Sequence, residues 1–136
     1  MSQNEKELIL RDLCMRLPYG VNMATGYGIG LLTSIRINDF DEKLGINIDP
    51  TFIRMFSVND VKPYLFPFSS MTEEQKKELN DITNLDIEIA ISHIKNDTPN
   101  YVTGLNRLNW LLKNHFDIYG LIPMGLAEDA TNKNIY

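Results

Sequence analysis

His115 and Asp117 form the only close histidine–carboxylate pair in the sequence, and such a pair can transfer protons. Two positions apart, the side chains would share one face of an extended segment, where the carboxylate orients the imidazole and raises its basicity. With His93 they would supply three metal ligands, but their spacing matches no recognised zinc pattern. His115 also follows a predicted helix, whose C-terminal dipole and free carbonyl groups favour a histidine there. We favour this structural interpretation and assign neither a catalytic residue nor a metal ligand.

Three aromatic side chains alternate in the stretch 61–72, and this alternation places rings on one side of an extended segment. Such rings can form an exposed binding surface, although burial against a sheet is the more common use of large apolar residues. We favour burial and keep the exposed alternative open. The candidate binding residues are these three rings and a group near the C-terminus: Tyr64, Phe66, Phe68, His115, Asp117 and Tyr119.

The sequence contains no complete catalytic or phosphate-binding motif. The segment Gly26-Tyr-Gly-Ile-Gly30 has part of a phosphate-loop pattern, but Thr33 stands where the third glycine belongs and a strand-like segment replaces the helix. These glycines are typical of a hairpin turn. The single cysteine, Cys14, lies on a predicted apolar helix stripe and is expected to be buried and inert. We therefore predict that the protein is not an enzyme and uses no cofactor.

Charge and hydropathy disfavour nucleic-acid binding and membrane insertion. The 136 residues carry a net charge of −5, and no basic cluster is longer than Lys76-Lys77, whereas duplex-binding proteins usually present a basic patch. No stretch approaches the roughly 18 apolar residues of a membrane span. The N-terminus lacks the order of a signal peptide, and one cysteine fits a reducing cytosol. The expected location is the cytoplasm.

Capping residues and periodicity predict an N-terminal helix followed by short strands. Ser2 and Glu5 form a capping box that begins a helix, which Pro18 and Gly20 end after about Leu17. Four or five strands, separated by glycine, Asn-Asp and Asp-Pro turns, then predict a small antiparallel sheet or SH3-like barrel over residues 19–68.

Residues 52–58 are predicted to form a further strand, whose side chains point alternately to its two sides. Phe52, Arg54 and Phe56 fall on one side, and Ile53 and Met55 fall on the other. A nucleic-acid-binding alternative would require four basic residues of this half to converge on one face of the sheet: Arg36, Lys43, Arg54 and Lys62.

Residues 61–72 mark the change from strands to helices. Two prolines bias the residues before them toward extended geometry. Thr72 and Gln75 then form a capping box, and Glu73 is placed to pair with Lys77 one helical turn later.

The last third of the chain is predicted to be helical. Residues 85–94 fit either a helix or a strand, and we favour a helix. Thr98 and Pro99 begin a further helix that ends near Asn114. Residues 115–126 form an apolar, glycine-broken tail that should pack back onto the body, and residues 129–136 are expected to fray.

Three blocks of the sequence are similar to a family of small uncharacterised proteins carried by gut bacteria and their phages or prophages. The blocks are residues 12–21 (DLCMRLPYGV), 62–75 (KPYLFPFSSMTEEQ) and 110–126 (WLLKNHFDIYGLIPMGL). Family members often carry two adjacent histidines where this chain has Asn114-His115. The resemblance implies a phage-associated or mobile-element protein in the host cell cytoplasm, and it implies no particular activity.

These observations predict one α+β domain over residues 1–136, with an N-terminal helix and small sheet or barrel in residues 1–71 and helices in residues 72–136. The leading functional hypothesis is a non-enzymatic module that binds a host or phage protein. A nucleic-acid-associated replication or recombination accessory, and a small hydrolase using His115 and Asp117, remain alternatives.

Overall fold

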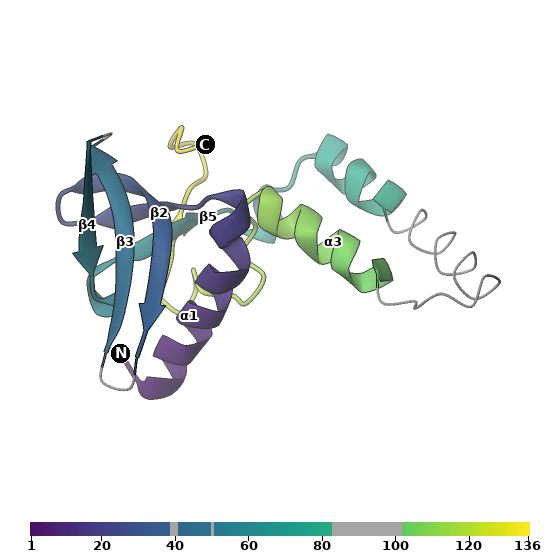
Figure 1. Cartoon of the computed structure of the whole chain (residues 1–136). Helices are drawn as coiled ribbons and strands as arrows, with labels where there is room; N and C mark the ends of the chain where they lie inside the picture. The colour runs from purple at the N-terminus through teal and green to yellow at the C-terminus, as the bar shows by residue number, and fades with distance from the viewer. Residues whose placement is uncertain (39–40, 50, 83–101) are drawn as a thin grey trace.

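In the computed structural model, which describes residues 1–38, 41–49, 51–82 and 102–136, helix α1 lies across one face of a sheet (Figure 1). The helices are α1 (Gln3–Arg16), a helix spanning residues 73–82, and α3 (Val102–Lys113), with 3-10 turns η1 (Leu17–Tyr19), η2 (Val58–Asp60) and η3 (Phe68–Ser70). The strands are β1 (Asn22–Thr25), β2 (Gly28–Ile37), β3 (Glu42–Asp49), β4 (Phe52–Phe56), β5 (Lys62–Leu65) and β6 (Glu128–Asp129). This arrangement confirms the predicted α+β class.

The N-terminal helix begins as predicted, because the Ser2 hydroxyl accepts the Glu5 N–H at 3.1 Å. Its buried apolar residues, Ile9, Leu10 and Leu13, pack against the sheet. The expected burial of Cys14 was wrong, since this side chain is exposed. The helix is rotated so that two polar residues of the same helix enter the core in its place, as described below.

The strands form one sheet in the order β4-β3-β2-β1-β5-β6, and all described pairs are antiparallel except β5 with β6. The glycine-rich segment is the predicted hairpin turn, with Thr25 paired to Gly28. A Cβ at Gly30 would lie 2.6 Å from Ile46 Cγ2, so only glycine allows β2 and β3 to pack this closely. The structure confirms a mostly antiparallel sheet, whereas its closure into an SH3-like barrel stays a prediction.

The change from strands to helices occurs where the sequence predicts it. After β5, the Gln75 side chain accepts the Thr72 N–H at 2.9 Å and the Thr72 hydroxyl accepts the Gln75 N–H at 3.1 Å, which confirms the capping box. The ion pair in this first turn joins Glu73 to Lys76 at 3.1 Å, whereas the sequence predicted Lys77. Both partners are well exposed, so the pair adds little to stability.

The end of α3 is a Schellman motif with a histidine in the position that usually holds glycine. His115 has a φ of +65°, and its N–H donates to the Leu112 carbonyl while the Phe116 N–H donates to the Leu111 carbonyl, each at 3.0 Å. The chain then turns back toward the sheet, as predicted.

The segment after residue 126 is ordered against the sheet, so the prediction of fraying over residues 129–136 was wrong. Strand β6 pairs in parallel with β5, Ala130 is 1% exposed, and the Ala130 N–H donates to the Leu65 carbonyl at 2.8 Å. The Tyr136 hydroxyl accepts the Asn22 N–H and donates to the Tyr64 carbonyl, and so bridges β1 and β5. These bonds link groups far apart in sequence, which local composition cannot indicate.

The predictions for residues 85–94 and for the Thr98-Pro99 helix start lie outside the described residues. Within the described ranges, none of the helices has the length and apolar character needed to cross a membrane.

Candidate functional site

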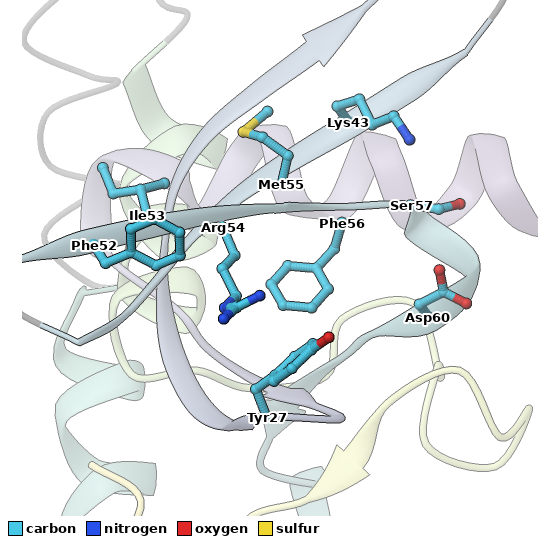
Figure 2. A pocket seen from close by; sticks show the side chains of 9 residues that line it. All are labelled: Tyr27, Lys43, Phe52, Ile53, Arg54, Met55, Phe56, Ser57 and Asp60. Atoms are coloured by element: carbon cyan, nitrogen blue, oxygen red, sulfur yellow. The ribbon is translucent and has the colours of Figure 1, made fainter.

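An open groove of about 460 Å³ lies along β4, the strand at one end of the sheet (Figure 2). Its lining combines aromatic, aliphatic and charged side chains from β3, β4, η2 and the β1–β2 turn: Tyr27, Lys43, Phe52, Ile53, Arg54, Met55, Phe56, Ser57 and Asp60. Among the described strands, only β3 pairs with β4. The outer side of β4 therefore offers unpaired backbone groups beside this groove.

Tyr27 reaches the groove because the hairpin turn holds it in place. The Thr25 hydroxyl accepts the Tyr27 N–H at 3.0 Å and donates to the Gly28 carbonyl at 2.6 Å. Gly28 has a φ of +120°, which L side chains rarely adopt. The Tyr27 ring, 65% exposed, then lies 6.1 Å from the Phe56 ring.

Arg54 stands at the centre of the groove, on the same side of β4 as Phe52 and Phe56. Its guanidinium carbon lies 4.2 Å from the centre of the Tyr27 ring and 5.1 Å from that of Phe52, so two aromatic faces hold the cation in place. Within the described part of the chain, no carboxylate lies within ion-pair distance of Arg54. In these ranges its N–H groups therefore have no carboxylate partner, and they can donate to one on a ligand.

The other charges near the groove are only loosely paired. Lys43 Nζ lies 4.0 Å from the Asp41 carboxylate, with both side chains substantially exposed, and Asp60 lies beyond Ser57, away from the Arg54 guanidinium (Figure 2).

At the start of β4, hydrogen bonds from the Thr51 N–H and hydroxyl lower the pKa of the Asp49 carboxyl. This Asp49 turn fixes the entry into β4.

The three alternating rings of the sequence do not form one surface. Tyr64 lies on β5, 5.9 Å from the Lys133 ammonium. Phe66 contacts the rings of Phe116 and Tyr136. Phe68 lies in η3, where its 48% exposed ring stacks on Phe116 at 5.9 Å. The rings mainly connect the sheet to the returning tail.

His115 and Asp117 have separate partners. Both Asp117 oxygens accept backbone N–H groups, from Leu121 at 2.8 Å and from Ile122 at 2.9 Å. The His115 ring stacks on Tyr136 at 3.5 Å between centroids, and its Nδ1 is buried with no partner among the described residues. Burial, reinforced by the Arg16 charge, lowers the pKa of His115 to about 4. Tyr119, the remaining sequence candidate, is 36% exposed and lies outside the groove.

A buried ion pair in α1 was missed by the sequence analysis. Arg16 donates to both carboxylate oxygens of Asp12, at 2.7 and 3.0 Å, and also to the Phe116 carbonyl at 2.6 Å. Both side chains are 0% exposed. Burial raises the pKa of the Asp12 carboxyl, and the hydrogen bonds and charge of Arg16 oppose that rise. Their i,i+4 spacing on a helix with apolar neighbours was the available signal.

The basic residues of the nucleic-acid alternative do not converge on one face of the sheet, because Lys43 and Arg54 lie on opposite sides of β4 (Figure 2). Lys43 and Arg54 line the groove, whereas Lys62 lines a separate hollow and lies 3.9 Å from the Glu128 carboxylate. Arg36 is exposed on β2 outside the groove.

In the described ranges, no three His, Cys, Asp or Glu side chains gather as a metal site would require; His93 lies outside these ranges. Comparisons of the chain with protein-family models, with curated proteins and with solved structures find no match.

Proposed function

We propose that the protein is a non-enzymatic interaction module that binds an extended segment of a partner protein along β4. The observation that supports this proposal is the coincidence of a strand edge, unpaired among the described residues, with an open groove of exposed apolar side chains. An added strand would hydrogen-bond to the free backbone groups of about two or three residues of β4, since outward-facing groups alternate along a strand. In the phage-associated setting that the resemblance implies, the partner is a host or phage protein in the host cytoplasm.

The exposed side chains around this edge are suited to such a contact. Phe52, Ile53 and Met55 are 53%, 52% and 46% exposed. Exposed apolar residues gathered at a strand edge typically mark either a partner surface or an aggregation site. The charge of Arg54 in the middle of β4 opposes uncontrolled pairing of that edge, which leaves a specific partner as the better interpretation.

The test compares two matched pairs of substitutions on the outer face of the sheet. Ile53→Lys with Met55→Lys places charges on the β4 edge, and Ile29→Lys with Leu31→Lys makes the same change on β2, where exposure is similar (48% and 44%). Each tagged variant, checked for folding by circular dichroism, is used to capture proteins from a host lysate. We expect the β4 pair to lose the partner that wild type and the β2 pair retain.

Equal capture by both pairs would show that β4 is not the binding edge. If wild type enriches no protein and instead turns over a substrate, the non-enzymatic assignment is wrong.

A second candidate is a single-stranded nucleic acid, which the combination of Tyr27, Phe52 and Arg54 favours. Bases stack on aromatic rings, and arginine adds cation–π contacts and charge. Only two basic residues line the groove, and the chain carries a net charge of −5, so this candidate ranks second. Retention of a labelled oligonucleotide at low salt, lost in Arg54→Gln and at higher salt, would support it; no gel shift at low salt would remove it.

A further inference from the structure

We infer that the segment bound along β4 carries an aspartate or glutamate, whose carboxylate pairs with Arg54. This inference rests on the proposed function and specifies the chemistry of the partner. It is derived from three features of Arg54: its place in the strand, the rings that hold it, and the surrounding charges.

Arg54 is the central residue of the five-residue strand β4. The centres of the Tyr27 and Phe52 rings lie 4.2 and 5.1 Å from its guanidinium carbon, and these cation–π contacts hold the cation without providing a carboxylate for its N–H donors. A planar guanidinium fork matches a carboxylate with two parallel N–H···O bonds. Because the rings already limit the motion of the side chain, less conformational entropy is lost when the carboxylate binds.

The charges around the groove favour an acidic ligand over a second copy of the chain. An antiparallel β4–β4 pair centred on this strand would place Arg54 opposite Arg54, and like charges directly opposite one another are destabilising. Lys43, the other basic residue of the lining, lies on the Met55 side of β4, opposite the side that carries the Arg54 guanidinium (Figure 2). Asp60, the acidic residue of the lining, lies away from the guanidinium (Figure 2). Within the described ranges, the Arg54 charge therefore has no carboxylate within ion-pair distance, and an acidic ligand can supply one.

Strand periodicity extends this inference to a sequence pattern in the partner. In an added strand, the residue opposite Arg54 and the residues two positions before and after it lie on the same face. These flanking residues would face Phe52 at one end and the region of Phe56 and Tyr27 at the other. The expected partner pattern is therefore apolar, any residue, acidic, any residue, apolar.

Blocked peptides of about seven residues test this inference, since strands of that length are common. The probes alternate threonine and valine, with valine two positions on either side of a central aspartate, asparagine or lysine. Each is titrated into ¹⁵N-labelled full-length protein while the β4 amide signals are followed by NMR. We expect the aspartate peptide to bind about fivefold more tightly than the asparagine peptide, the ratio for a contribution of about 1 kcal/mol from one exposed charge pair. The lysine peptide should bind most weakly.

Two variants test whether Arg54 causes the preference for the aspartate peptide. Arg54→Gln should abolish the difference between the aspartate and asparagine peptides, and Arg36→Gln, which removes the same charge outside the groove, should preserve it. Equal binding of all three peptides at β4 would overturn the carboxylate inference and leave strand addition standing. If no peptide shifts the β4 amides, strand addition itself fails. Analytical ultracentrifugation tests whether a second copy of the chain occupies the β4 edge. A dimer of the wild type that is lost in Ile53→Lys with Met55→Lys would identify that second copy as the occupant and overturn the inference.

Discussion

Replacing Arg16 with methionine should destabilise the protein more than any surface substitution. The guanidinium is 0% exposed, donates twice to Asp12 and once to the Phe116 carbonyl, and thereby ties α1 to the returning tail. Methionine leaves a buried carboxyl and a buried carbonyl without these donors. Breaking such a pair costs about 3–5 kcal/mol, a large share of the 5–15 kcal/mol that typically separates folded from unfolded domains.

Urea unfolding followed by circular dichroism at neutral pH measures this loss. Arg11→Met on the exposed side of the same helix is the matched control, and its effect should stay within about 0.5 kcal/mol. Adding Asp12→Leu to Arg16→Met removes the stranded carboxyl and should recover part of the stability. The reasoning is refuted if Arg16→Met costs no more than Arg11→Met, or if the two core substitutions destabilise additively.

Three further predictions concern pH and close packing. The pKa of His115 is lowered to about 4 in the folded protein, so between pH 6.5 and 4 the imidazole is protonated in the unfolded chain but not in the folded chain. Urea titrations should therefore show the free energy of unfolding falling as the pH drops from about 6.5 to 4. The fall should be smaller in His115→Phe. Burial raises the pKa of Tyr136 to about 12, so the contribution of this side chain to the free energy of unfolding should be complete below about pH 10 and disappear toward pH 12. Tyr136→Phe breaks the β1–β5 bridge and should lower the free energy of unfolding by about 1 kcal/mol at neutral pH. This variant should not show the loss of stability at alkaline pH. Gly30→Ala should lower the thermal midpoint of unfolding, because the new Cβ would lie 2.6 Å from Ile46, a clash that costs about 1–3 kcal/mol. Gly26→Ala is the control, since a Cβ there meets nothing within 4 Å. Equal midpoints for the two variants would contradict the packing argument.

The sequence predicted the separate segments that line the groove but not their assembly into one site. Period-two alternation correctly placed Phe52, Arg54 and Phe56 on one side of a strand, because successive side chains of a strand point to opposite faces. The glycines around Tyr27 indicated a turn. That this turn folds over β4, and that β4 lies at the end of the sheet, depends on strand order, which no local pattern specifies.

By itself the sequence determined the local elements: the Ser2 cap, the glycine hairpin, the alternation of β4 and the Thr72–Gln75 capping box. Each depends on the dihedral preferences and hydrogen bonds of neighbouring residues, so a short stretch of sequence contains all the information required. Tertiary structure alone decided that Cys14 faces outward while an ion pair enters the core, and that the last residues bridge β1 and β5. It also decided that Tyr27 and Phe52 flank Arg54. The Tyr136 bridge and the Tyr27–Arg54 contact join residues distant in sequence, and the Asp12–Arg16 pair, although local, is buried only because the rest of the chain folds over it.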